Sequence, residues 1–254
     1  MTRVGIQISS VRKYLQTPAD VLASFQKVSA MGYRIIQIQW ISPDVPFEFI
    51  RDALQETGLT CVGTQDYYDE VVARWADFVA MNDLWGSRNV CVSGIPERYR
   101  TYEGCLAFAH ELNQRSESLE RQGKLLSFHP RASDVIQFAG QNSLEIILQN
   151  TRQECQFVLD VYHLVKAGFD PLEWIYRVAG RNDLIHFKDR KLKPDGSEVL
   201  MPVGQGDIEW EPVFQACIAT HIQYGFAEQE SWLKDPFECL QESYDYIVSK
   251  GITA

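Results

Sequence analysis

Short apolar runs rich in Val and Ile recur along the chain, and each is followed by polar residues and then by a longer segment with helical periodicity. The apolar runs predict eight strands, at residues 4–8, 35–39, 60–64, 89–93, 125–128, 157–160, 184–187 and 225–229. The periodic segments predict helices between them, at residues 18–31, 47–57, 71–84, 101–122, 143–150, 171–179, 211–220 and 236–249. The hydrophobic pattern therefore indicates consecutive strand–helix units.

Proline and glycine mark the ends of several of these helices. Pro18 and Pro171 stand at predicted helix starts, and "TPADVLASFQKVSAMG" and "RDALQETG" each end in Gly. Proline is tolerated in the first turn, where its missing N–H has no partner to lose, and glycine readily adopts the left-handed conformation that ends a helix. These boundaries support the strand–helix reading.

Eight strands joined by helical crossovers should be parallel and should close into a barrel. An open doubly wound sheet normally carries a Gly-rich phosphate loop after its first strand, whereas that turn here reads "ISSVRKYLQTPAD". The 254 residues are close to the roughly 250 of an eight-fold barrel, and no linker-like stretch divides them. The predicted fold class is α/β: a single (β/α)8 TIM barrel forming one domain over residues 1–254.

Charge and composition exclude several partners. The formal net charge of -10 would repel nucleic acid and anionic membrane surfaces. No apolar stretch reaches the roughly 18 to 20 residues of a membrane span, and the N-terminus has no apolar signal core, so we expect a cytoplasmic protein. The six cysteines include no CxxC pair, and we expect reduced thiols in the core.

Polar residues at the predicted strand ends differ between the two halves of the chain. The first four strands end in neutral or mixed groups: Gln7, Gln39, Thr64 with Gln65 and Asp66, and Ser93. The last four end in ionisable groups: His129, Asp160 with His163, His186 with Lys188 and Asp189, and Glu228 with Gln229 and Glu230. Because the chemistry of a TIM barrel lies at the carboxyl ends of its strands, the second half should supply most of the site.

An Asp, a His and a Glu on three successive strand ends form a mixed oxygen and nitrogen ligand set that suits Mn²⁺, Co²⁺, Zn²⁺ or Mg²⁺. Such an ion would polarise a substrate oxygen and ease removal of the neighbouring C–H proton. Each residue also has an ordinary structural interpretation. Asp160 would then cap a loop, His186 would be a core histidine, Glu228 a surface charge, and Lys188 and Asp189 an exposed ion pair.

Several segments together resemble the sugar phosphate isomerase/epimerase family of xylose isomerase-like barrels. They are "GIQISSVRKYLQTPADVLASFQKVSAMGYRIIQIQ", "FVLDVYHLVKAGFDPLEWI", "LIHFKDRK", "PVGQGDIEWEPVF" and "GFAEQESWLKDPFECLQESYDYI". The DxxH with AGxDP, the HxKD, the VGxGDIxW and the ExE occur in family order, and the likeness runs over nearly the whole chain. It implies a barrel that acts on a small sugar or polyol, with homodimers or homotetramers common.

The resemblance implies one divalent metal ion held by a Glu at strand five, an Asp at strand six, a His at strand seven and a Glu at strand eight. Asp160, His186 and Glu228 match the last three. His163 matches a substrate-contacting histidine, and Lys188 matches the lysine that follows the metal-binding histidine. Glu228, His163 and Lys188 are therefore the expected catalytic residues. The expected substrate contacts are His129, His163, Lys188 and Gln7.

The fourth metal ligand is where the chain departs from the family. After strand five it reads "FHPRASDVIQFAGQNSLEIILQNT", which is closer to the inosose dehydratase branch, and matching places Gln137 at the ligand position. Asp134 or His129 are alternatives. A Gln carbonyl can coordinate a hard cation, but it brings no charge and cannot act as a base. Strand two also has Gln37 where the family often has Glu.

This departure weakens a two-base epimerisation and leaves one-base chemistry, with Glu228 or His163 removing a proton and Lys188 assisting at oxygen. The leading hypothesis is a metal-dependent isomerase or epimerase that removes a proton alpha to a carbonyl of a keto or aldo sugar or polyol. The alternatives are an inosose-type dehydratase and a sugar-binding barrel without turnover. The related DNA-repair endonucleases need a multi-zinc cluster and a basic face, and five histidines with a charge of -10 argue against them.

Overall fold

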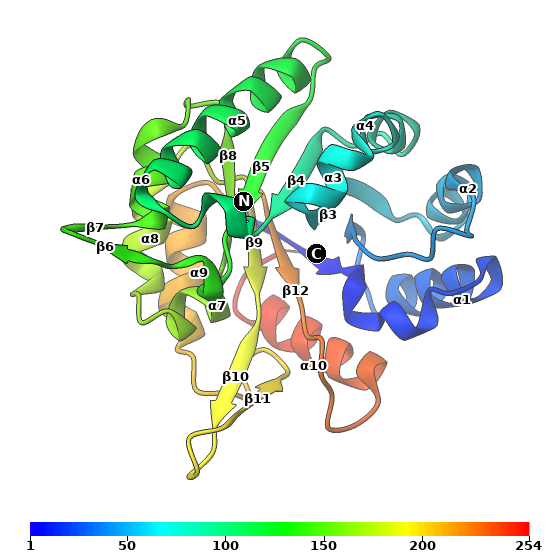
Figure 1. Cartoon of the computed structure of the whole chain (residues 1–254). Helices are drawn as coiled ribbons and strands as arrows, with labels where there is room; N and C mark the ends of the chain where they lie inside the picture. The colour runs from blue at the N-terminus through cyan, green and yellow to red at the C-terminus, as the bar shows by residue number, and fades with distance from the viewer. Residues whose placement is uncertain (254) are drawn as a thin grey trace.

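The computed structural model describes residues 1–253 and forms a closed parallel barrel (Figure 1). Neighbouring strands follow the order β1-β12-β9-β8-β5-β4-β3-β2. Their bounds are β1 Arg3–Gln7, β2 Ile35–Ile38, β3 Thr60–Tyr67, β4 Asn89–Ser93, β5 Leu125–His129, β8 Gln156–Asp160, β9 Leu184–Phe187 and β12 Tyr224–Ala227. This closed barrel confirms the prediction of a (β/α)8 TIM barrel. The fold could be predicted because the hydrophobic patterns of strands and helices are local properties of the chain.

Helices surround the barrel in the order that the periodicity predicts. They are α1 Pro18–Ala30, α2 Phe47–Thr57, α3 Tyr68–Ala73, α4 Trp75–Leu84, α5 Tyr102–Glu120, α6 Ser143–Asn150, α7 Val161–Lys166, α8 Pro171–Arg177, α9 Trp210–Ala219 and α10 Pro236–Ser249. Thr17 caps α1 in a reciprocal capping box with Asp20 and precedes Pro18, as the sequence signal indicates. Within residues 1–253 no helix is long and apolar enough to span a membrane.

The hydrophobic pattern did not predict several short elements. The helix expected at residues 71–84 is two helices, because Arg74 has non-helical backbone angles between α3 and α4. Three short 3-10 segments, η1 Ile8–Tyr14, η2 Glu97–Tyr99 and η3 Ala132–Asp134, lie in loops after strands. Two hairpins, β6 Gln137–Phe138 with β7 Gln141–Asn142 and β10 Asp189–Leu192 with β11 Glu198–Met201, extend from the barrel (Figure 1). Such elements are too short to show periodicity.

The barrel interior has an apolar floor and a polar upper layer. The floor is a small cluster of buried side chains: Ile35, Cys91, Val158, Leu184 and Phe226. Gly5 leaves room for it, since a Cβ there would collide with the Phe226 ring. Side chains alternate along a strand, so Gln37, Asp160 and His186 face the same interior two positions later. All six cysteines are buried and unbonded, as expected.

Candidate metal centre

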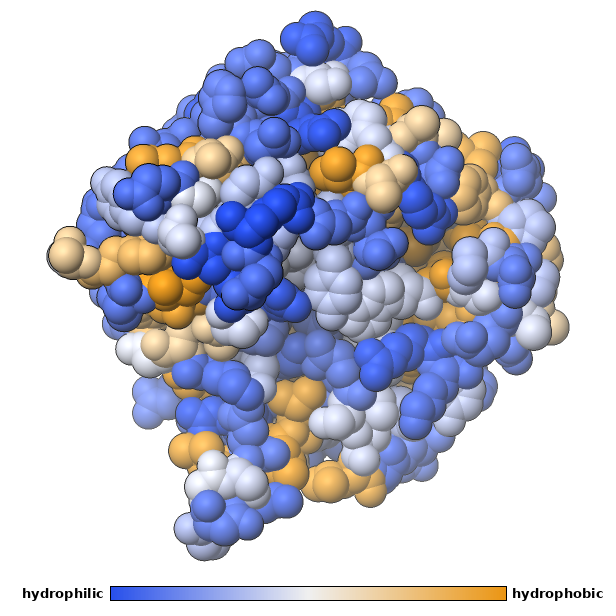
Figure 2. Space-filling model, viewed as in Figure 1, coloured by the Kyte–Doolittle hydropathy of each residue, from blue (hydrophilic) through white to orange (hydrophobic). Residues whose placement is uncertain are grey.

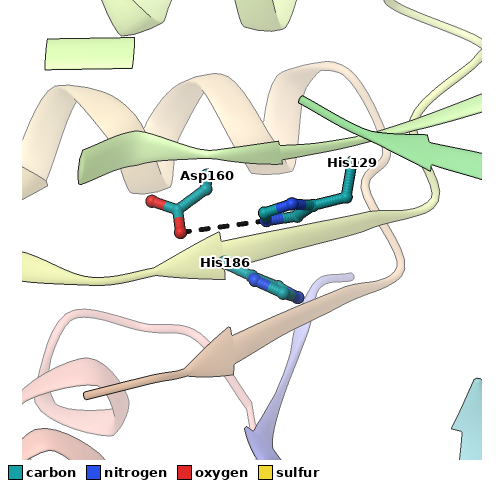
Figure 3. A group of neighbouring side chains, drawn as sticks. All are labelled: His129, Asp160 and His186. Carbon is teal, nitrogen blue, oxygen red and sulfur yellow. Dashed lines mark ion pairs between the residues drawn. The ribbon is translucent and has the colours of Figure 1, made fainter. Parts of the chain in front are cut away.

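Three buried side chains meet at the carboxyl ends of adjacent strands (Figure 3). His129 ends β5, Asp160 ends β8, and His186 lies on β9, in register with Asp160. One ligand atom from each lies within 4.8 Å of the others. The Nε2 of His129 is 3.9 Å from Oδ2 of Asp160, and Figure 3 shows the two groups facing each other with the His186 ring beside them.

The outer atom of each of these three side chains is fixed by a neighbour. His129 Nδ1 lies 3.1 Å from Ser93 Oγ, and His186 Nε2 donates to Gln37 Oε1 at 2.7 Å. Asp160 Oδ1 accepts the His163 backbone N–H and so caps α7. Fixing one ring nitrogen of a histidine sets its tautomer and leaves the other nitrogen free to bind a metal ion.

The inner atom of each side chain makes no hydrogen bond within residues 1–253, although His186 Nδ1 lies 2.9 Å from the carboxylate of Glu228. These atoms are His129 Nε2, Asp160 Oδ2 and His186 Nδ1. A buried polar atom without a partner is costly, and a native structure normally provides one. Three such atoms that converge on one point fit a metal ion better than they fit a satisfied core.

Glu228 and Lys188 complete the charged group. Glu228 follows the end of β12, and its Oε2 lies 2.9 Å from His186 Nδ1 and 3.9 Å from Lys188 Nζ. Lys188 Nζ also lies 3.9 Å from Asp160 Oδ2 and donates to Glu230 Oε1 at 2.6 Å. Both Glu228 and Lys188 are buried, so Glu228 is not the surface charge that its ordinary interpretation requires. Its carboxylate oxygen lies beside the three converging atoms and could serve as a fourth ligand.

Burial and the neighbouring charges set the ionisation of these groups. Burial raises the pKa of Asp160 to about 7 against the opposing effect of Lys188. Burial also acts to raise the pKa of Glu228, but Lys188 and His186 outweigh it and hold that pKa below its ordinary value. Burial, then Lys188, lowers the pKa of His163 to about 3, and burial with His186 lowers the pKa of His129. His129 and His163 are therefore neutral at neutral pH and keep a free lone pair.

The structure does not bury the predicted fourth ligand, Gln137, with these side chains. Gln137 lies on β6, pairs with Asn142 and has an exposed side chain, because the chain after β5 leaves the barrel mouth in a hairpin (Figure 1). Asp134 is buried, but its carboxylate is bound by Arg100 and Arg131. Of the three alternatives, only His129 lies with the cluster.

The remaining predicted residues lie close to the cluster. His163 is partly exposed, with its Nε2 at 3.8 Å from Asp160 Oδ2. Gln7 is fully buried and donates to Gln37 Oε1 at 3.1 Å, so its role as a substrate contact stays a prediction. Sequence reasoning placed Ser93 and Glu230 at strand ends but did not predict their contacts with His129 and Lys188. Ser93 ends a strand, and that position is the only signal that could have indicated it.

Asp189 is not half of an exposed ion pair. It is fully buried, and it accepts the backbone N–H groups of Gly204 and Gly206 and the indole N–H of Trp210. A side chain at Gly206 would collide with this carboxylate. The "VGQGDIEW" segment therefore wraps around Asp189 and anchors the loop that follows Lys188.

The structure is thus a parallel eight-stranded TIM barrel that carries, at the carboxyl ends of its strands, a His, Asp, His and Glu cluster able to hold a metal ion. A family model described as "Xylose isomerase-like TIM barrel" matches residues 25–223. The chain therefore belongs to the xylose isomerase-like TIM barrel family.

Solved structures of similar fold agree with this assignment. A sugar phosphate isomerase/epimerase from Parabacteroides distasonis superposes with a TM-score of 0.81 at 19% identity, covering 100% of both chains. An L-ribulose 3-epimerase gives 0.75 at 16% identity over 98% of this chain and 94% of its own. A probable 3-DHS dehydratase from Bacillus anthracis gives 0.71 at 11% identity, covering 98% and 99%. No curated protein sequence matches the chain.

Proposed function

We propose that this protein is a divalent-metal-dependent isomerase or epimerase that removes a proton alpha to a carbonyl of a small sugar or polyol. The observation that carries the proposal is the convergence of three buried ligand atoms, from His129, Asp160 and His186, beside the Glu228 carboxylate. The family, and the similar folds of a sugar phosphate isomerase/epimerase and an L-ribulose 3-epimerase, support the same reaction class.

The residues present fit a metal ion. His129, Asp160, His186 and Glu228 would supply two neutral nitrogens and two carboxylate oxygens, a mixed set that suits Mn²⁺, Co²⁺ or Zn²⁺ and is less suited to Mg²⁺, which prefers oxygen alone. When bound, the ion would act as a Lewis acid on a carbonyl or hydroxyl oxygen of the substrate. His129 takes the place that Gln137 was predicted to fill.

The protein's own side chains supply the proton transfer. Lys188, whose pKa is raised by Glu228, Asp160 and Glu230 despite the effect of burial, is a cation that can stabilise a developing negative oxygen. Glu228 is ionised and His163 is neutral, so either can accept a proton. His163 is the more accessible of the two, and its Nδ1 has no hydrogen-bond partner in the described part of the chain.

A dehydratase is the second candidate. Strand β5 ends in a histidine and brings no carboxylate to the cluster, which leaves fewer bases for exchange on two faces of a substrate. Removal of one proton followed by loss of water needs only one base. The similar fold of a probable 3-DHS dehydratase is consistent with this alternative.

The test separates these reactions. Protein purified in Mn²⁺ is assayed for bound metal and then incubated in D₂O with a panel of ketoses, aldoses and keto-inositols. We expect about one ion per chain and exchange of a substrate C–H proton seen by NMR. An ultraviolet enone signal would assign the dehydratase instead. If the protein retains no metal and catalyses no exchange, the proposal is overturned in favour of a sugar-binding barrel without turnover.

A matched pair of variants tests the role of Glu228. Glu228→Gln keeps the shape but removes the base, and we expect it to slow exchange by about 10²-fold or more. Glu48→Gln, at an exposed position in the first turn of α2, is the control and should leave the exchange rate unchanged. If Glu228→Gln retains full exchange, His163 is the base.

A further inference from the structure

A cavity of about 380 Å³ lies beside the barrel mouth, between helices α2 and α4 and over the ends of β2 and β3. Its walls are mostly apolar: Phe47 and Ile50 come from α2, Phe78 and Met81 from α4, and Ile41 from the loop after β2. Figure 2 shows hydrophobic residues at the surface on this side of the molecule, between the positions of α2 and α4 in Figure 1. The cavity lies outside the four candidate ligands, and the mechanism above does not use it.

The backbone at the rim of the cavity is strained. Trp40, which lines it, has a φ of 58°, in the left-handed region that non-glycine residues rarely adopt. Its indole N–H donates to Asp66 Oδ1 at 3.2 Å, and its ring packs against Tyr67 with centroids 5.8 Å apart. Strain of this kind persists where the surroundings enforce it, and it is concentrated at ligand sites.

A row of amides joins the cavity to the metal centre. Gln39 and Gln65 line the cavity, and Gln65 Nε2 donates to Gln39 Oε1 at 3.4 Å. Gln37 Nε2 donates to Gln65 Oε1 at 3.3 Å, and Gln37 Oε1 accepts from His186. Gln37 is thus the one side chain between Gln65, in the inner wall of the cavity, and the candidate ligand His186. A substrate held at the metal centre would have to pass these amides, which suit hydroxyl groups, to reach the apolar cavity.

The charged residues of the lining are already paired. Asp66 accepts the N–H groups of Trp40 and Tyr67, and Arg74 pairs with Asp77 at 3.1 Å. An apolar cavity of about 150 Å³ is enough to hold benzene, so the larger volume here accommodates a phenyl ring or a short alkyl chain. We propose that this cavity binds an uncharged apolar or aromatic substituent of the substrate. The substrate is then a glycoside or a similarly substituted polyol, an identification that rests on the proposed function.

The cavity is tested first by itself, with metal-free protein and benzyl alcohol as the probe. Trp40 and Trp85 line the cavity, so binding should change the tryptophan fluorescence. Ile41→Trp places bulk in the cavity and should weaken benzyl alcohol binding at least tenfold in saturation-transfer NMR. Leu172→Trp, a partly buried residue on α8 outside the cavity, is the matched control, and equal Tm values exclude unfolding. Undiminished binding in Ile41→Trp would overturn the proposal.

The second arm uses the metal-loaded protein and pairs of phenyl and methyl glycosides of the same sugars. We expect tighter binding of the phenyl compounds, at least tenfold, and loss of that preference in Ile41→Trp but not in Leu172→Trp. Equal binding of both glycosides overturns the substrate assignment. Failure of the proposed function would show differently, as absent metal and absent C–H exchange while benzyl alcohol still binds.

Discussion

The two halves of the barrel present different chemical groups at the carboxyl ends of their strands. Strands β1 to β4 bring mostly neutral side chains to the mouth, with Gln7, Gln37, Gln65 and Ser93 in buried positions and Asp66 on β3 as the exception. Strands β5, β8, β9 and β12, or the residues directly after them, bring ionisable groups: His129, Asp160, His186, Lys188 and Glu228. The ionisable half offers the inward lone pairs, and the neutral half fixes them, since Gln37 and Ser93 bind the outer nitrogens of two histidines. One half therefore supplies ligands and charge, and the other supplies orientation.

The largest effect is expected in the ionisable half. Asp160→Asn keeps the α7 cap through its remaining oxygen but removes the charge from the centre of the cluster. We expect metal affinity to fall by about 10³-fold or more, because the neutral amide leaves one carboxylate to balance a divalent ion. Metal content by mass spectrometry after dialysis is the measurement. Asp77→Asn, at an exposed surface pair, is the control. Stoichiometric metal in Asp160→Asn would contradict the assigned ligand set.

A smaller effect is expected from the neutral half, and it tests whether that half acts by orientation. Gln37→Leu removes the acceptor of the His186 Nε2 proton, and loss of such a partner typically lowers metal affinity by about 10- to 100-fold. Gln37→Glu restores an acceptor of the same length and should recover most of that loss. ¹⁵N-NMR of the histidine rings reports the His186 tautomer. If Gln37→Leu and Gln37→Glu both bind metal as tightly as the unaltered protein, Gln37 has no positioning role.

The smallest effect concerns acid stability of the metal-free protein. The folded-state pKa of His163 is about 3, below its ordinary 6.5, so below pH 6.5 the unfolded chain binds a proton there that the folded chain does not. Stability is thus lost as pH falls from 6.5 toward 3, by up to about 1.4 kcal/mol per pH unit. His163→Asn should flatten that slope in urea unfolding at pH 4 to 7, whereas Gln65→Met in the neutral half should not. An unchanged slope in His163→Asn would contradict the assigned ionisation.

Most of the fold could be predicted from the sequence because its signals are local. All eight barrel strands lie within two residues of the predicted bounds at either end, apart from β3, which runs three residues further to Tyr67. The helix starts at Pro18 and Pro171 are also as predicted. The break at Arg74, helix α7 and the two hairpins were missed, since each spans too few residues to repeat a pattern.

The site could be predicted less completely. Asp160, His186 and Glu228 follow from strand ends and family order, and the structure brings them together. The choice among Gln137, Asp134 and His129 depends on where a loop turns after β5, and no periodicity records that. Gln37 was noted as a missing acid, but its contact with His186 joins residues 149 positions apart.

By itself, the sequence determined the repeating strand–helix units, the parallel barrel and the group of ionisable residues at the later strand ends, because periodicity and chain order suffice for these. Only the tertiary structure decided that His129 turns inward while Gln137 turns outward, that an amide row orients His186, and that a cavity opens between α2 and α4. Each depends on contacts between strands distant in sequence, and the packing of the closed barrel, rather than any local preference, sets those contacts.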